Sequence, residues 1–186
     1  MRIISGKYKG RKIEPPGKLP VRPTTDFAKE GLFNVLTNRI DFEETEALDL
    51  FAGTGNISFE LISRGCKSVL SVEQNYNCVK FINSMCEKLN EHNVRTQAAD
   101  VFRFLGFCTR QFDLIFADPP FELDNAQLIP GIIFERKLLK PDGLLIMEHS
   151  ERFDFSKYPN YSQTRSYGKV NFSFFVATDS QIKTEE

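Results

Sequence analysis

Residues 47–56 read Ala-Leu-Asp-Leu-Phe-Ala-Gly-Thr-Gly-Asn, an apolar strand that runs directly into a glycine turn. A helix-like segment, residues 57–63, follows the turn. This order of strand, glycine turn and helix start lets the backbone approach a nucleotide-like ligand closely. A dinucleotide-binding fingerprint needs a third glycine three residues after Gly55, and Ser58 stands there instead. The stretch therefore predicts a nucleotide-binding α/β fold. Without the third glycine, however, it matches a site for a pyrophosphate at the helix start less well.

Strand and helix patterns alternate after this stretch, which predicts a parallel sheet with helices on both faces. With 186 residues and 41% hydrophobic content, the chain is long enough for one well-cored domain and too short for two. Residues 158–167 and 170–177 predict an antiparallel hairpin that finishes the sheet, and Pro141-Asp142-Gly143 predicts a turn into the fifth strand. Expected strands fall near 47–51, 68–72, 94–98, 112–117 and 143–148, and expected helices near 55–64, 75–91, 101–107 and 126–139.

The first 40 residues predict an extension ahead of the sheet. Residues 1–14 suggest a hairpin-like arm of two short strands. Thr24 or Thr25 can cap a helix that runs to about residue 39, with Phe27 on its apolar side. We thus expect a basic arm and helix in residues 1–40, the main domain in 41–178 and a frayed tail in 179–186.

The charge is unevenly distributed along the chain, although its net value is only −1. Residues 1–40 hold nine Lys/Arg against three Asp/Glu, a balance of +6, and the remainder holds 15 against 22, a balance of −7. A small basic segment on an acidic domain suits a localised phosphate-binding face. The alternative is a solvated edge, where lysines prevent strand pairing. Most of this charge comes from Arg2, Lys7, Lys9, Arg11 and Lys12.

Other features exclude several classes of protein. No apolar stretch approaches the roughly 20 residues of a membrane helix, and the start of the chain lacks an apolar signal core. The four cysteines show no Cys-x-x-Cys spacing, and the chain has only two histidines. We therefore expect a cytoplasmic protein with reduced thiols and no metal site. We also expect a monomer.

A second motif, residues 113–121, reads Asp-Leu-Ile-Phe-Ala-Asp-Pro-Pro-Phe. An apolar strand here stops at a carboxylate, two prolines and an aromatic ring. Neither proline can donate a backbone hydrogen bond, and Pro120 keeps Pro119 out of the helical region. The resulting stiff turn presents the Asp118 side chain, the Pro119 carbonyl and the Phe121 ring. Two acceptors beside a flat apolar face suit a planar heteroaromatic amine; the alternative is a solvated aspartate and a core phenylalanine.

Acidic residues also follow other expected strands. Glu73 closes the second strand, 18 residues after Gly55, and could accept both hydroxyls of a ribose. Asp100 follows the third strand, where it could contact a cofactor or could simply cap the next helix. In a doubly wound sheet, ligands bind outside the carboxyl ends of the strands. Gly53, Glu73, Asp100 and Asp118 should therefore lie along one edge.

Two motifs together, Asp49-Leu-Phe-Ala-Gly-Thr-Gly55 and Asp118-Pro-Pro-Phe121, resemble class I S-adenosylmethionine-dependent methyltransferases that modify exocyclic or amide nitrogens. The opening Met1-Arg-Ile-Ile-Ser-Gly-Lys-Tyr-Lys-Gly-Arg11, with Arg22-Pro-Thr-Thr-Asp26 and Leu32-Phe-Asn34, is similar to RsmD-type guanine-N2 methyltransferases of bacterial 16S ribosomal RNA. The resemblance runs from Met1 to about Val176. That family commonly has an arginine after Thr-Thr-Asp, where this chain has Phe27, with Lys29 nearby.

This resemblance implies a Rossmann-like fold: a doubly wound, mostly parallel sheet with an antiparallel C-terminal strand and a small N-terminal hairpin and helix. It implies that S-adenosylmethionine methylates the exocyclic N2 of a specific guanine in 16S rRNA of the small ribosomal subunit. The catalytic residues would be Asp118, Pro119, Pro120 and Phe121. The cofactor would contact Asp49, Phe51, Ala52, Gly53, Thr54, Gly55, Glu73, Gln74, Asp100 and Val101. The RNA would contact Arg2, Lys7, Lys9, Arg11, Lys12, Arg22, Thr24 and Thr25.

Three alternatives remain open on the sequence. A methyltransferase that acts on adenine N6 of DNA or on a protein amide could use the same Asp-Pro-Pro-Phe turn. An NAD-dependent oxidoreductase is disfavoured by Ser58 and by the lack of an obvious acid for hydride transfer. A non-catalytic RNA-binding module would explain the basic arm but not the carboxylates Asp118 and Glu73.

Overall fold

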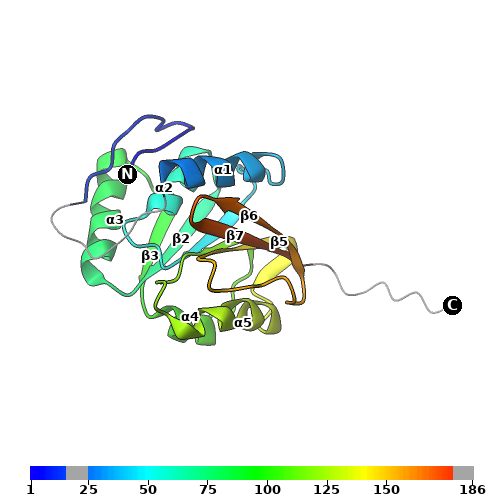
Figure 1. Ribbon diagram of the computed structural model, residues 1–186. Coiled ribbons are helices and arrows are strands. Elements are labelled where there is room, and N and C mark those ends of the chain that lie inside the picture. Colours follow the sequence, from blue (N-terminus) through cyan, green and yellow to red (C-terminus); the bar gives the residue numbers. More distant parts are fainter. Residues whose placement is uncertain (16–24, 178–186) are drawn as a thin grey trace.

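A computed structural model describes residues 1–15 and 25–177, which form one seven-stranded sheet with helices on both faces (Figure 1). The strands are β1 Glu46–Leu50, β2 Ser68–Glu73, β3 Val94–Ala98, β4 Phe112–Ala117, β5 Leu139–His149, β6 Tyr161–Tyr167 and β7 Val170–Val176. The helices are α1 Asp26–Thr37, α2 Asn56–Ser63, α3 Tyr76–Leu89, α4 Val101–Phe107 and α5 Ile129–Glu135, with a 3-10 turn, η1, at Asp124–Leu128.

The strand order is β3-β2-β1-β4-β5-β7-β6. Strands β1 to β5 run parallel, whereas β7 is antiparallel to β5 and β6 is antiparallel to β7. The chain turns from one half of the sheet to the other between β1 and β4, so the crevice that binds ligands in such folds lies at the carboxyl ends of these two strands. The predicted doubly wound sheet with an antiparallel C-terminal hairpin is confirmed.

Two apolar clusters cover the two faces of the sheet. Because side chains alternate along a strand, Leu114 and Phe116 face one cluster while Ile115 and Ala117 face the other. Helices α1, α2 and α3 pack on the first face, and α4 and α5 on the second, as Figure 1 shows. None of the described helices combines the length and the apolar character needed to cross a membrane.

Two expectations about the chain before and within β5 are wrong. The helix expected over 126–139 is a 3-10 turn followed by the short helix α5. Pro130 lies in the first turn of α5, where its missing N–H does no harm, and the residues before it form the separate turn. Pro141-Asp142-Gly143 lies inside β5 as a bulge, since the register jumps from Phe112↔Leu139 to Leu114↔Leu144.

Phe27 is also placed differently from the expectation. Its side chain is 69% exposed and does not join the apolar side of α1. The ring instead meets Tyr167 of β6 edge-on, with 5.9 Å between the ring centroids. The rest of the helix agrees with the prediction, because Thr25 caps α1 by accepting a hydrogen bond from the Ala28 N–H.

The N-terminal arm, residues 1–14, contains one isolated β-bridge, Arg2↔Lys12, instead of the two expected strands. Ile3 and Ile13 are 2% and 1% exposed and belong to the same apolar cluster as α1 and α2. The arm is therefore packed against the domain and shares its core.

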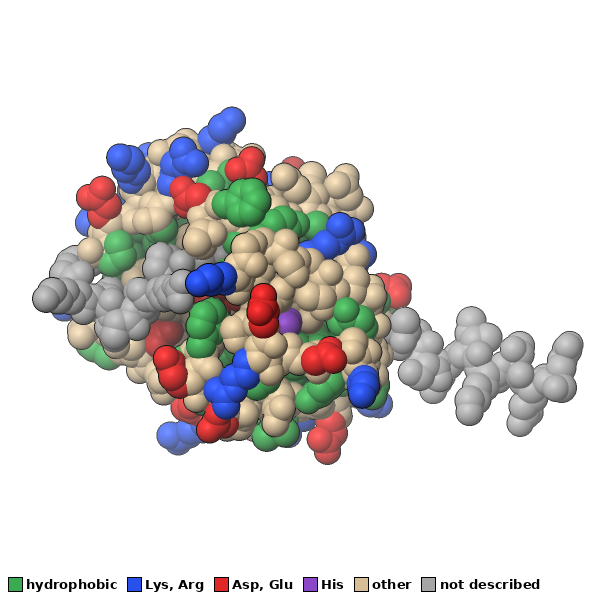
Figure 2. All heavy atoms as spheres, viewed as in Figure 1, with side chains coloured by type: hydrophobic (Ala, Val, Ile, Leu, Met, Phe, Trp, Pro, Cys, Tyr) green, Lys and Arg blue, Asp and Glu red, His purple; other side chains and the backbone are tan. Residues whose placement is uncertain are grey.

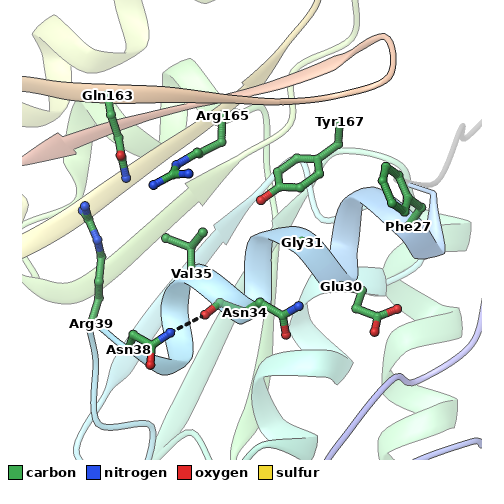
Figure 3. Close-up of a pocket in the computed structure, with 10 residues that line it drawn as sticks. All are labelled: Phe27, Glu30, Gly31, Asn34, Val35, Asn38, Arg39, Gln163, Arg165 and Tyr167. Atoms are coloured by element: carbon green, nitrogen blue, oxygen red, sulfur yellow. Dashed lines mark hydrogen bonds between the residues drawn. The ribbon is translucent and has the colours of Figure 1, made fainter.

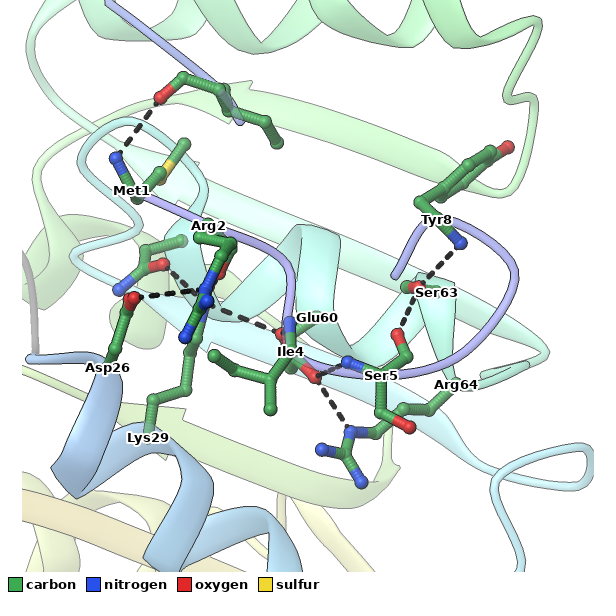
Figure 4. A network of polar contacts seen from close by, with 12 residues as sticks. Met1, Arg2, Ile4, Ser5, Tyr8, Asp26, Lys29, Glu60, Ser63 and Arg64 are labelled. Carbon is green, nitrogen blue, oxygen red and sulfur yellow. Dashed lines mark hydrogen bonds and ion pairs between the residues drawn. The ribbon is translucent and has the colours of Figure 1, made fainter. Parts of the chain in front are cut away.

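A buried carboxylate, Glu60 of α2, holds the arm in place (Figure 4). It accepts hydrogen bonds from the Ile4 and Ser5 N–H groups at 2.8 and 3.1 Å, and from Arg64 Nε at 2.9 Å. Lys29 Nζ, only 1% exposed, lies 3.4 Å from the same carboxylate. Lys29 also donates to the Arg2 carbonyl, and to Asn56 Oδ1 at the start of α2. The arm, α1 and the start of α2 thus share one polar centre.

Candidate active site

The glycine turn after β1 requires left-handed backbone at three positions, with φ of 61° at Phe51, 54° at Gly53 and 80° at Gly55. A Cβ atom on Gly55 would lie 2.8 Å from the ring of Phe59, so this position needs glycine for space as well as for conformation. Thr54, between the two glycines, is buried and donates to Met1 Sδ at 3.7 Å. The arm therefore contacts the predicted cofactor turn directly.

Asp49 lies beneath this turn and is 2% exposed. Its Oδ2 accepts hydrogen bonds from Ser58 N at 3.0 Å and Ser58 Oγ at 2.5 Å, and Ser58 Oγ lies 2.7 Å from Ser71 Oγ. Ser58 thus joins the start of α2 to β1 and β2, which accounts for a hydroxyl where a dinucleotide fingerprint has glycine. Burial raises the pKa of Asp49 to about 7, although the Ser58 hydrogen bonds oppose the shift.

Glu73, at the end of β2, connects the glycine turn to the next helix. Its Oε2 accepts from Gly53 N at 2.9 Å and its Oε1 accepts from Asn75 N at 2.7 Å. Asn75 in turn caps α3. Each carboxylate oxygen has more than one lone pair, so these bonds leave capacity for the hydroxyls of a ribose. Gln74 follows it and is exposed.

Asp100 caps α4 by accepting a hydrogen bond from Arg103 N at 2.9 Å. The cap that the sequence offered as an alternative is therefore present. Asp100 is exposed at the carboxyl end of β3 while Val101 is buried, and a contact of either residue with the adenine remains a prediction.

The Asp-Pro-Pro-Phe turn leaves β4 next to the glycine turn, and Asp118 N donates to Leu50 O of β1 at 3.4 Å. Within the part of the chain that the structure describes, no hydrogen-bond donor meets the Asp118 carboxylate or the Pro119 carbonyl. Burial raises the pKa of Asp118 well above its ordinary value, and the nearby charges of Glu148 and Asp49 raise it further. Phe121 is half-buried and Pro120 is exposed.

Sequence reasoning missed two residues of this turn's surroundings. Glu148, 3% exposed, lies near the end of β5, directly beyond the Ala117↔Met147 pair and so beside Asp118. Like Glu73, Glu148 is an acidic residue at the carboxyl end of an apolar strand, and this pattern could have identified it from the sequence. Arg152 donates to the Phe121 carbonyl at 3.4 Å and pairs with Asp124, which ties the turn to the segment after β5. No local pattern indicates that contact.

The basic residues of the arm are distributed over two edges of the sheet. Arg2 pairs with Asp26, the first residue of α1, at 3.4 Å. Lys7 N donates to the carbonyl of Ser63, the last residue of α2, and Lys7 Nζ lies 2.6 Å from Glu91, just after α3. Helices in this fold start at the carboxyl edge and return to the amino edge, so the tip of the arm lies on the edge opposite Asp118.

Lys and Arg side chains gather over the arm with acidic ones between them, at the upper left of Figure 2. Lys9 lies in the turn at the tip, since its N–H donates to Gly6 O, and Arg11 lies 5.7 Å from the centroid of the Tyr8 ring. Arg2 and Lys12 are the arm cations near the carboxyl edge. Lys29 is buried at the polar centre, and Arg22 and Thr24 lie outside the described residues.

The described residues contain no group of three or more His, Cys, Asp or Glu side chains arranged to hold a metal ion. All four cysteines are buried and unpaired.

Comparison with known proteins identifies close relatives. The family model described as conserved hypothetical protein 95 matches residues 1–176. The ribosomal RNA small subunit methyltransferase D of Haemophilus influenzae is 34% identical over 155 residues, which cover 80% of this chain and 78% of the relative. A putative rRNA methyltransferase of Bacillus subtilis is 30% identical, with coverage of 83% and 85%. The structure of a putative methyltransferase from Escherichia coli has a TM-score of 0.83 and 26% identity, with coverage of 96% and 98%.

These matches confirm the predicted fold as that of class I methyltransferases, with S-adenosylmethionine as the cofactor. They also confirm the family that the N-terminal and Asp-Pro-Pro-Phe motifs predict. The chain belongs to the conserved hypothetical protein 95 family, the family of the ribosomal RNA small subunit methyltransferase D proteins.

Proposed function

We propose that this protein methylates the exocyclic N2 of a specific guanine in 16S rRNA of the small ribosomal subunit. One observation carries the proposal. The Asp118 carboxylate and the Pro119 carbonyl stand at the carboxyl end of β4, beside the glycine turn of β1, and neither accepts a hydrogen bond from any residue in 1–15 or 25–177. The names of the relatives, ribosomal RNA small subunit methyltransferase D, support ribosomal RNA as the substrate.

The turn and its neighbours fit S-adenosylmethionine. Gly53 and Gly55 give the turn the left-handed backbone that lets the main chain curve closely around a ligand. Glu73 would hold the ribose hydroxyls, Asp49 underlies the part of the turn that would hold the methionine, and Asp100 would reach the adenine with Val101 and Gln74. When bound, the cofactor supplies a methyl group on a positively charged sulfur, already activated for transfer.

The protein's own contribution is to orient the guanine. The two hydrogens of the N2 amino group would be accepted by the Asp118 carboxylate and the Pro119 carbonyl, which turns the nitrogen lone pair toward the methyl donor. Phe121 would stack on the base, which must leave its neighbours in the RNA to enter the site. Because the pKa of Asp118 is raised, its carboxylate holds a proton more strongly than an ordinary one and can take the proton released by the amine.

The substrate class is tested by measuring transfer of labelled methyl groups to naked 16S rRNA, assembled small subunits, DNA and protein. We expect label in ribosomal RNA, alone or in the subunit, and labelling at least about 100-fold slower with Asp118→Ala. Label that enters DNA or protein instead would favour the alternative amino-methyltransferases. The proposal includes a cytoplasmic monomer that works without a metal, which sedimentation and an assay in the presence of a chelator would check.

A further inference from the structure

A groove separates α1 from the edge strand β6 and has a volume of about 680 Å³ (Figure 3). Its floor and one wall come from α1, and Gln163, Arg165 and Tyr167 of β6 form the other wall. The residues of α1 and its C-terminal end that line it are Phe27, Glu30, Gly31, Asn34, Val35, Asn38 and Arg39. None of these residues belongs to the site described above.

One end of the groove lies at the catalytic edge of the sheet. His149 ends β5 at the carboxyl edge and pairs with Asn171, and Tyr167 pairs with the adjacent Val170. Tyr167 and its partner Phe27 therefore stand on the same edge as Asp118. Strand β6 is three strands from β4, roughly 14 Å at the usual spacing. An RNA strand that presents a base to Asp118 would reach the groove by crossing the ends of β5 and β7.

The aromatic end of the groove has an exposed stacking surface. Phe27 is 69% exposed and its ring meets Tyr167 edge-on. Tyr167 lies against α1 only because residue 31 is glycine, since a Cβ there would lie 2.1 Å from the ring. A glycine inside a helix costs about 1 kcal/mol relative to alanine, so the position of the Tyr167 ring is maintained against a local cost. Exposed rings of this kind stack on unpaired bases.

The other end carries hydrogen-bond donors that lack acceptors. Arg39 and Arg165 are exposed, and neither guanidinium group forms an ion pair or hydrogen bond with any residue the structure describes. Gln163 Nε2 is buried and has no partner among these residues. Figure 3 shows the Arg39 and Arg165 side chains and the Gln163 amide nitrogen pointing into the groove. An anionic chain rich in acceptor oxygens complements these groups, whereas Glu30, the acid of the lining, lies toward the aromatic end.

We propose that this groove binds the single-stranded RNA that flanks the target guanine, with a base stacked on Phe27 and Tyr167 and phosphates at Arg39 and Arg165. The inference rests on the proposed function for the identity of the RNA. It assigns phosphate contacts to Arg165 of β6 and to Arg39 just after the C-terminal end of α1, with Arg39 at the end of the groove farther from Asp118. Phe27 stands where the family commonly has arginine, so in this chain a stacking contact with the RNA would replace a charge contact.

The test measures binding of a short labelled single-stranded RNA across a salt series. Arg39→Gln with Arg165→Gln should lower the slope of log K against log salt by about 1.4, since each phosphate contact on a single strand contributes about 0.7. Phe27→Ala should weaken binding about tenfold at constant slope, as loss of one stacked base does. The matched control is Lys80→Gln with Lys88→Gln, which removes two exposed charges from α3 and should leave both quantities unchanged.

The possible outcomes separate this inference from the proposed function. An unchanged slope in the arginine double variant overturns the groove assignment, even if the enzyme methylates RNA. Loss of affinity for assembled subunits with unchanged affinity for naked RNA also overturns it, because the groove would then hold a protein. A reduced slope in an enzyme that methylates no RNA would support RNA in the groove and refute the proposed activity.

Discussion

Replacing Glu60 by glutamine tests the polar centre that joins the arm to the cofactor turn. Both carboxylate oxygens already accept hydrogen bonds, Oε2 from Ile4 N and Oε1 from Ser5 N and Arg64 Nε, and Lys29 Nζ lies 3.4 Å from Oε2. Whichever way a glutamine amide turns, its NH2 group faces donors. Lys29, 1% exposed, also loses the charge that compensates its own.

Removing one partner of a buried ion pair destabilises by about 3–5 kcal/mol. Glutamine retains the shape and one acceptor, so we expect a loss near the lower limit, about 3 kcal/mol. Burial lowers the pKa of Lys29, and the negative charge of Glu60 opposes that shift. The pKa of Lys29 should therefore fall further in the variant. A lysine whose pKa is lower in the folded state than in the unfolded state costs stability while it is charged. Raising the pH toward the pKa of lysine in the unfolded state should therefore restore part of the lost free energy of unfolding.

The assay is urea denaturation of wild type and Glu60→Gln at neutral and alkaline pH. The control is Arg2→Ala, which breaks the exposed Arg2–Asp26 pair and should cost less than about 1 kcal/mol. Because Lys29 also holds Asn56 at the glycine turn, Glu60→Gln should weaken S-adenosylmethionine binding as well. A stability loss no larger than that of the control would refute the role assigned to Glu60.

Three further predictions concern the carboxylates of the site. Glu73→Ala should weaken binding of S-adenosylmethionine by about 1.5–3 kcal/mol in calorimetry, because the ribose acceptor and the support of the turn are both lost; unchanged affinity would remove Glu73 from the site. Asp49 has a pKa of about 7 in the folded state against an ordinary 3.8, so its ionisation costs up to about 4 kcal/mol of stability as the pH rises from about 4 to about 7. Asp49→Asn keeps an acceptor for Ser58 and should flatten this decline when the free energy of unfolding is measured against pH. The turnover rate should rise with pH as Asp118 deprotonates, and Glu148→Gln should move this rise to lower pH by removing a like charge; a profile that does not move would exclude the coupling.

The sequence predicts those elements that its local pattern delimits. β3, β4 and α4 have the expected residues, because an apolar run bounded by polar or turn-forming residues determines them. Pro141-Asp142-Gly143 has the composition of a turn, but its pairing with β4 makes it a bulge in β5. Sheet pairing is decided by residues far away in the chain, so local composition could not distinguish the two structures.

The candidate site was predictable to the extent that topology determines it. Acids and glycines at strand ends must meet at one edge of a parallel sheet, and this placed Glu73, Asp100 and Asp118 correctly. The roles of Ser58 and Glu60 depend on side chains that meet only after folding. The edge on which each arm cation lies likewise depends on how the arm docks, which its composition does not encode.

The most direct test is a single-turnover reaction with small ribosomal subunits that lack the modification, followed by mass spectrometry of the digested RNA. Wild type should yield N2-methylguanosine at one position of 16S rRNA. Asp118→Ala should bind S-adenosylmethionine with unchanged affinity and react at least about 100-fold more slowly, a loss on the scale of removing one transition-state hydrogen-bond partner. Wild-type rates in Asp118→Ala, or a methyl group on any atom other than guanine N2, would contradict the account.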